Sequence, residues 1–84
     1  MPPVTIYTRQ FCGYCTAAKR LLSEKRIDFV EIDATGDAEK RSEMISRSGR
    51  FTFPQIFVGA RHVGGCDDLF ELQARGELDT LLAA

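Results

Sequence analysis

Two cysteines in the segment Cys12–Cys15, which reads Cys-Gly-Tyr-Cys, limit what this chain can fold into more than any other feature. The short run Val4–Tyr7 before them is apolar, β-branched and aromatic, and it predicts a buried strand. Residues 13–25 after them repeat apolar side chains with helical spacing, which predicts an amphipathic helix. A strand that runs through a cysteine pair into a helix places both thiols at the N-terminal end of that helix.

Cysteines in this position suit redox chemistry. A helix start presents free backbone N–H groups and the positive end of the helix dipole. Both favour the thiolate, which is the nucleophile in disulfide exchange. We expect Cys12 to be the more exposed thiol and the nucleophile, with positive charge nearby from Arg9, Lys19 and Arg20. Cys15 lies one turn further on and is expected to be shielded, so that it can resolve a mixed disulfide formed on Cys12.

The remaining pattern predicts an α/β fold. Further strands are expected at Phe29–Asp33, Gln55–Val58 and Arg61–Val63, and further helices at Ala38–Ser48, from about Asp67 to Gly76, and at Leu78–Leu82. The order β-α-β-α-β-β-α, with a short helix at the end, implies two parallel strands first and an antiparallel pair last. We therefore expect one domain over residues 1–84, in which helices flank a four-stranded mixed sheet. The cysteine pair would lie at the C-terminal edge of a strand, where ligands bind in open α/β sheets.

Composition and charge exclude several classes of function. Hydrophobic residues make up 44% of the chain, charged residues make up 27%, and the net charge is −1, so the overall balance attracts neither nucleic acid nor anionic membrane. No apolar run approaches the ~20 residues of a membrane helix, and the first residues lack the features of a signal peptide. Three cysteines do not suggest a secreted disulfide framework. We expect a cytoplasmic protein with no nucleic-acid or membrane partner.

The Phe53-Pro54 bond is the first of two features that extend the candidate site. An X–Pro bond is the only common position for a cis peptide. A cis bond would turn the backbone of Phe53 toward the cysteines, where it could pair with an extended peptide. A trans proline would merely begin a strand, and the sequence leaves both alternatives open.

The second feature is the segment Gly64–Asp68, which reads Gly-Gly-Cys-Asp-Asp at an expected helix start. Two glycines leave backbone N–H groups accessible to a carboxylate, and Asp67 suits an amino group beside it. The ligand implied carries both charges, as an amino-acid terminus does. The alternative is an ordinary loop and helix cap, with Cys66 as a small packed residue.

Zinc is a rival interpretation of the same residues. Cys12, Cys15, His62 and Cys66 together would form a Cys₃His set of the zinc type. The separation between Cys15 and His62 far exceeds that of a compact zinc motif, and a closed site would occupy the nucleophile. We therefore expect no metal in the main interpretation and treat His62 as a half-exposed strand residue.

Three segments together resemble the glutaredoxin family: Tyr7–Cys15, Thr52–Phe57 and Gly64–Asp68, in order and at matching separations over essentially the whole chain. Thioredoxins share the fold but carry a Trp before the cysteine pair, and this chain has no Trp. The resemblance implies a thioredoxin fold and a dithiol enzyme that uses glutathione as co-substrate. Such an enzyme reduces protein–glutathione mixed disulfides and protein disulfides as a monomer, and glutathione reductase recycles the glutathione.

The resemblance also implies a glutathione site with two different ends. Arg9, together with Arg50, would lie near the glycine carboxylate, and Tyr14 would flank the sulfur. The backbone of the residue before a cis proline would pair with the cysteine of glutathione, and a glycine-rich helix start would hold the γ-glutamyl end. The residues that the resemblance assigns to this wall and this end are Thr52, Phe53, Pro54, Gly65, Cys66 and Asp67.

Two positions depart from the commonest pattern of the family. Phe53 replaces the usual Val before the proline, which keeps the backbone role, and Gly13 replaces the usual Pro. Some family members with Gly or Ser at the latter position hold a [2Fe–2S] cluster between two subunits, ligated by the first cysteine of each and two glutathione thiols. The alternative function is therefore a dimeric cluster carrier or sensor with Cys12 as a ligand. Cys15 weakens this alternative, because dedicated carriers usually have Ser there.

Overall fold

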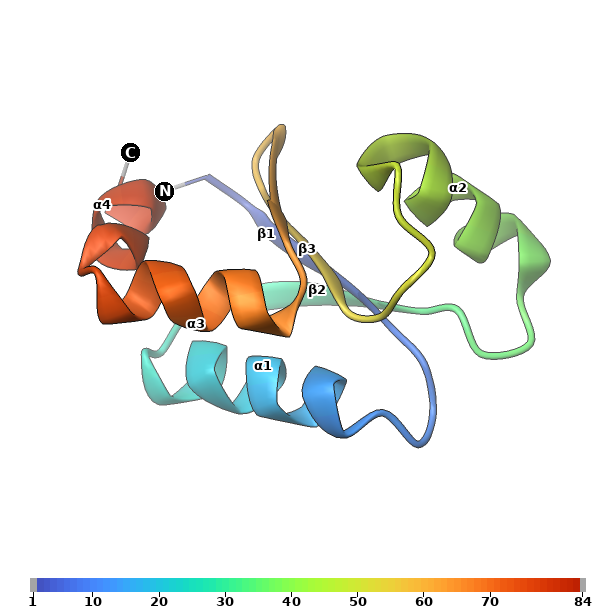
Figure 1. Cartoon of the computed structure of the whole chain (residues 1–84), viewed down its shortest axis with the longest axis horizontal. Coiled ribbons are helices and arrows are strands. Elements are labelled where there is room, and N and C mark those ends of the chain that lie inside the picture. Colours follow the sequence, from blue (N-terminus) through green and yellow to red (C-terminus); the bar gives the residue numbers. More distant parts are fainter. Residues whose placement is uncertain (1, 84) are drawn as a thin grey trace.

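The computed structural model describes residues 2–83 and contains every expected element, with ends that shift by a residue or two (Figure 1). The strands are β1 (Val4–Thr8), β2 (Phe29–Asp33), β3 (Gln55–Val58) and β4 (Arg61–Gly64). The helices are α1 (Gly13–Glu24), α2 (Ala38–Ser48), α3 (Cys66–Ala74) and α4 (Glu77–Ala83). None of the helices in residues 2–83 is both long and apolar enough to cross a membrane.

The four strands form one mixed sheet in the order β2-β1-β3-β4. Strand β1 runs parallel to β2 and antiparallel to β3, and β3 and β4 form an antiparallel hairpin. This arrangement confirms the mixed four-stranded sheet expected from the sequence and places β1 in the centre. The loop that leaves the C-terminal end of β1 carries the cysteine pair.

The two central strands bury side chains on both faces of the sheet, because successive residues of a strand point in opposite directions. Figure 1 shows α1 and α3 on one side of the sheet and α2 on the other. Helices α1, α3 and α4 cover a core whose strand residues are Val4, Ile6, Ile56 and Val58. Helix α2 covers a smaller core that joins Tyr7, Met44 and Phe57. Coverage on both faces explains why all four residues of β3 are buried.

Helix α2 begins and ends at the residues that the sequence indicates. The carboxylate of Asp37 accepts a hydrogen bond from the backbone N–H of Lys40 at 3.0 Å, which confirms the expected N-cap. Gly49 adopts a left-handed conformation (φ 71°) and ends the helix. The chain then leaves α2 as residues 50–54, which form one wall of the candidate site.

Candidate functional site

The cysteine pair lies at the junction between β1 and α1. Cys12 is the N-cap of α1 and Cys15 lies in its first turn, and the two side chains form a disulfide. Cys12 is 9% exposed and Cys15 is 2% exposed, so Cys12 is the more accessible sulfur, as expected. The backbone N–H of Cys15 donates a hydrogen bond to Sγ of Cys12 at 3.1 Å. The positive end of the helix is therefore directed at the sulfur of Cys12.

The cations expected near Cys12 are not equally available. Lys19 binds the carboxylate of Glu31 at 3.0 Å, so its charge is matched at the edge strand β2. The guanidinium of Arg9 lies 6.0 Å from the ring centre of Phe53, at the edge of the site. The first turn of α1 holds no acidic residue. The positive surroundings of Cys12 thus include the start of α1, whereas the charge of Lys19 is paired with Glu31.

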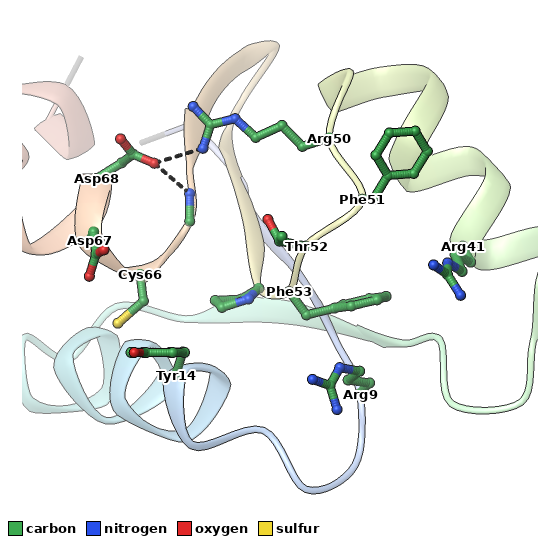
Figure 2. Close-up of a pocket in the computed structure, with 12 residues that line it drawn as sticks. Arg9, Tyr14, Arg41, Arg50, Phe51, Thr52, Phe53, Cys66, Asp67 and Asp68 are labelled. Atoms are coloured by element: carbon green, nitrogen blue, oxygen red, sulfur yellow. Dashed lines mark hydrogen bonds and ion pairs between the residues drawn. The ribbon is translucent and has the colours of Figure 1, made fainter.

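A groove of about 620 Å³ opens between the start of α1, residues 50–54 and the start of α3 (Figure 2). Every residue that the family resemblance assigns to glutathione lines it: Arg9, Tyr14, Arg50, Thr52, Phe53, Pro54, Gly65, Cys66 and Asp67. Three residues that the sequence did not single out for binding line it as well: Arg41, Phe51 and Asp68. The three sequence motifs therefore form one concave surface.

One end of the groove is cationic. Figure 2 shows Arg9 and Arg41 at the end away from α3, with Phe51 beside them on the wall. Arg41 belongs to α2, one turn after the Asp37 cap. No motif surrounds it in the sequence, so only the placement of α2 against the sheet could have identified it.

The other end of the groove is the start of α3. One oxygen of Asp68, Oδ2, accepts hydrogen bonds from the backbone N–H of Gly65 and from Nη1 of Arg50, both at 2.9 Å (Figure 2). The hydrogen bond from the Gly65 N–H is the main cause that lowers the pKa of Asp68 below its usual value, and the Arg50 guanidinium lowers it further. Partial burial opposes this shift without cancelling it. Asp67 is exposed beside them. The structure therefore places Arg50 at this end, paired with Asp68, and not beside Arg9.

The Phe53-Pro54 peptide bond is cis, which decides between the two alternatives that the sequence left open. The carbonyl oxygen of Phe53 lies 3.8 Å from Sγ of Cys12. This approach is a contact and not a hydrogen bond, since a disulfide sulfur carries no proton. The backbone of Phe53 thus faces the cysteine edge of the groove.

Cys66 is a free, buried thiol at the start of α3. Burial, and then the neighbouring charge of Asp67, raise the pKa of this thiol, which keeps it protonated at neutral pH. It therefore lines the groove as a small packed side chain, as the sequence suggested.

His62 is half-buried and lies within hydrogen-bond distance, 2.7 Å, of Oε1 of Gln55. Burial, together with the charge of Arg50, lowers the pKa of His62, although Asp68 opposes this shift. Within residues 2–83, no group of three or more His, Cys, Asp or Glu side chains is arranged to hold a metal ion. In this part of the chain, Cys12, Cys15, His62 and Cys66 are therefore not brought together as the Cys₃His set.

Comparison with known proteins agrees with this geometry. The glutaredoxin family model matches residues 4–63. Glutaredoxin 3 of Escherichia coli K12 is 58% identical over 82 residues, which cover 98% of this chain and 99% of that protein. The solution structure of a Brucella melitensis glutaredoxin is 58% identical with a TM-score of 0.86, covering 98% of this chain and 89% of that one.

A more distant relative has been solved with a ligand. The crystal structure of a buckwheat glutaredoxin–glutathione complex has a TM-score of 0.86 at 26% identity, covering 98% of this chain and 77% of that one. The fold, the Cys12–Cys15 disulfide and these relatives lead to one conclusion: this chain belongs to the glutaredoxin family of thiol-disulfide oxidoreductases and has a thioredoxin fold.

Proposed function

We propose that this protein reduces protein–glutathione mixed disulfides and protein disulfides, with glutathione as the electron donor. The observation that carries the proposal is the groove beside Cys12, which is cationic at one end and formed by a helix start at the other. Glutathione is a tripeptide with a carboxylate at each end and an amino group at one of them. Its charges match the two ends of the groove, and the buckwheat relative is a glutaredoxin in complex with glutathione.

Glutathione would lie along the groove with its sulfur toward Cys12. Arg9 and Arg41 would face the glycine carboxylate, and Tyr14 would flank the sulfur. The backbone of Phe53 would pair with the cysteine of glutathione, as an added strand pairs with a sheet edge. The remaining assigned residues form the wall and the γ-glutamyl end: Thr52, Pro54, Gly65, Cys66 and Asp67. Arg50 would act at this second end through its ion pair with Asp68.

Deglutathionylation needs only Cys12. Its thiolate attacks the glutathione sulfur of the mixed disulfide, the S–S bond breaks, and the protein leaves as a thiolate that takes up a proton. A second glutathione, as thiolate, then attacks the glutathione sulfur bound to Cys12. This step releases oxidised glutathione and restores the Cys12 thiolate. Glutathione reductase and NADPH return the oxidised glutathione to the thiol.

Reduction of a protein disulfide needs both cysteines. Cys12 attacks one sulfur of the substrate and forms a mixed disulfide with it. Cys15 then attacks the sulfur of Cys12, which releases the substrate as a dithiol and leaves the Cys12–Cys15 disulfide, the state seen in the structure. Two glutathione molecules reduce this bond in turn. The cycle requires a reducing compartment, and we place it in the cytoplasm, with residues 1–84 acting as one domain and a monomer.

The cluster carrier remains the alternative prediction. A Cβ at Gly13 would meet no atom within 4 Å, so the surface beside Cys12 is open. A dimer that shares a cluster would need such an open surface, together with thiols from two glutathione molecules. The single chain provides Cys12 alone, so the alternative depends on a second subunit that must be shown by experiment.

The test is a coupled assay on anaerobically purified protein. A glutathionylated substrate is mixed with glutathione, glutathione reductase and NADPH, and the loss of NADPH is followed. The proposal expects fast turnover that Cys12→Ser reduces to the rate of the uncatalysed exchange, because the attacking sulfur is gone. The carrier would be favoured instead if the protein without a cluster turned over slowly, and if it then took up iron and sulfide to form a brown, glutathione-dependent dimer.

A further inference from the structure

We propose that Gln55 is a positioning residue for the glutathione groove. Its side chain fixes the backbone that precedes the cis proline, so that Phe53 presents its peptide groups to the ligand, and His62 locks Gln55 in place. This inference rests on the proposed function, since it concerns the wall that glutathione would bind.

Gln55 is a polar residue in a position that would otherwise favour an apolar one. It begins β3, where it pairs with Tyr7 of β1, and it is 0% exposed. The other three residues of β3 are apolar and buried. A buried amide left without partners is destabilising, so its presence in a core strand calls for specific contacts.

Those contacts use both ends of the amide. Nε2 donates to the carbonyl oxygen of Thr52 at 3.0 Å and to the Thr52 hydroxyl at 3.1 Å. Oε1 lies 2.7 Å from Nε2 of His62. Because Oε1 can only accept, His62 must carry its proton on Nε2. The amide therefore has one orientation that satisfies all partners, and that orientation directs the donor end at Thr52.

The hydrogen bonds from Gln55 to Thr52 fix the orientation of the backbone that forms the groove wall. The Thr52 carbonyl points inward to Gln55, whereas the next carbonyl, of Phe53, points to Cys12 at 3.8 Å. The peptide between these two residues carries the Thr52 carbonyl and the Phe53 N–H, so a bond that fixes the Thr52 carbonyl also fixes the direction of the Phe53 N–H. Figure 2 shows Thr52 and Phe53 on the same wall of the groove, so the bond made behind the wall acts on the surface in front of it.

The ring of His62 is held in place by a stack of side chains on the α2 side of the sheet. Its ring lies 5.0 Å from that of Phe57, and the guanidinium of Arg47 lies 4.2 Å from the Phe57 ring on the α2 side of the sheet. Arg47 also donates to the hydroxyl of Tyr7 at 2.8 Å. This stack joins β4, β3 and α2, and it keeps the donor of His62 aligned with Gln55.

The decisive variant is Gln55→Met, which keeps the length of the side chain and removes both hydrogen-bonding ends. We expect kcat within about 2-fold of the wild type and a KM for glutathione about 5- to 10-fold higher, the effect of one lost positioning interaction. A residue that served only stability would lower the melting temperature without this separation of KM from kcat.

Thr8→Val is the matched control, because Thr8 is also a buried polar residue of the sheet, and it lies in β1. The substitution removes the hydrogen bond that the Thr8 hydroxyl donates to Glu31 at 2.7 Å, which belongs neither to Gln55 nor to the His62 stack. We expect a lower melting temperature and an unchanged KM. His62→Phe, which keeps the ring stack and removes the donor to Gln55, should raise KM by about 2- to 3-fold and provides the test if Gln55→Met does not fold.

Two outcomes would overturn these assignments, and they differ. If wild-type protein shows no glutathione-dependent turnover, the proposed function itself fails. If the wild type turns over but Gln55→Met or His62→Phe raises KM no more than Thr8→Val does, the positioning role of Gln55 fails while the proposed function stands.

Discussion

Helices α1 and α3 both begin beside the groove, but their first turns differ in chemistry. The cap of α1 is a sulfur, Sγ of Cys12, and the first turn contains no carboxylate. The cap of α3 is Gly65, and two carboxylates follow in the first turn. One of them, Asp68, turns back to accept the Gly65 N–H and also binds Arg50.

The two helix starts therefore have different effects. The start of α1 favours a negative charge on Cys12, whereas the start of α3 holds a neighbouring loop in place. At α1 no acidic side chain competes with sulfur for the positive end of the helix, so the charge of a thiolate is favoured there. At α3 the carboxylate of Asp68 occupies the positive end of the helix. Through its bond to Arg50, it also fixes the loop that forms one wall of the groove. Changes at α1 should therefore alter reactivity, and changes at α3 should alter stability and ligand binding.

The largest expected effect comes from Cys15→Ser, which keeps the backbone N–H at the start of α1 and removes the second sulfur. Deglutathionylation should stay within a few-fold of the wild type, because it needs only Cys12 and the helix start. Direct reduction of a protein disulfide should fall to near the uncatalysed rate, because nothing resolves the mixed disulfide. Both are measured with the coupled NADPH assay. Equal losses with the two substrates would contradict the division of labour between the cysteines.

The next prediction compares one glycine at each helix start. Gly64 has a φ of 120°, and a Cβ there would overlap the carboxylate of Asp68, whereas a Cβ at Gly13 would meet nothing within 4 Å. Gly64→Ala should lower the free energy of unfolding by about 2–4 kcal/mol, from backbone strain and a lost cap. Gly13→Ala should change it by less than about 0.5 kcal/mol. Urea unfolding of the oxidised proteins measures both, and similar values would show that the two helix starts tolerate a side chain equally.

Local signals in the sequence were sufficient for the helices and strands and for the place of the cysteine pair at a helix start. Asp37 and Gly49 mark the ends of α2 because caps depend on neighbouring backbone groups. The strand–cysteine–helix order located Cys12 for the same reason. These features involve residues close in the chain, so their patterns can be read without knowledge of the fold.

Contacts between distant residues could not be predicted in the same way. The family resemblance implied that Arg50 lies near Arg9, but the guanidinium of Arg50 pairs with Asp68, on another element. Lys19 was expected to support Cys12, but the parallel register of β1 and β2 brings Glu31 within its reach. Arg41 reaches the groove only because α2 packs across the sheet. Each of these placements depends on the assembled sheet and not on local spacing.

A smaller effect should separate the two adjacent aspartates of α3. Because the pKa of Asp68 is lowered in the folded protein, chiefly by the Gly65 N–H and then by Arg50, its contribution to stability is present above its ordinary pKa of 3.8 and is lost as the pH falls through its folded value. Asp68→Asn should therefore remove part of the acid sensitivity of unfolding, by no more than about 1 kcal/mol for a half-exposed pair.

Asp67→Asn is the matched control for that measurement, since it removes the same charge one residue away from an exposed side chain. Its acid unfolding curve should follow the wild type, while its KM for glutathione should rise. Urea midpoints recorded between pH 3 and 7 provide the comparison. If both variants shift the acid limb equally, net charge rather than the Asp68 contact sets the acid sensitivity.

The smallest effect tests the electrostatic start of α1 directly. Gly13→Glu would place a carboxylate in the first turn of α1, where the side chain has room, and Gly13→Gln would place a neutral side chain of the same size there. The carboxylate and the Cys12 thiolate would compete for the same positive helix end, which is worth about 0.3–1 kcal/mol. In the reduced protein at neutral pH, Gly13→Glu should therefore slow alkylation of Cys12 by iodoacetamide about 2- to 5-fold relative to Gly13→Gln. In the oxidised protein, which has no thiolate at Cys12, the same carboxylate should slightly raise the melting temperature, because it stabilises the start of the helix. Opposite signs for reactivity and stability would separate this mechanism from simple disruption of the site, which would lower both.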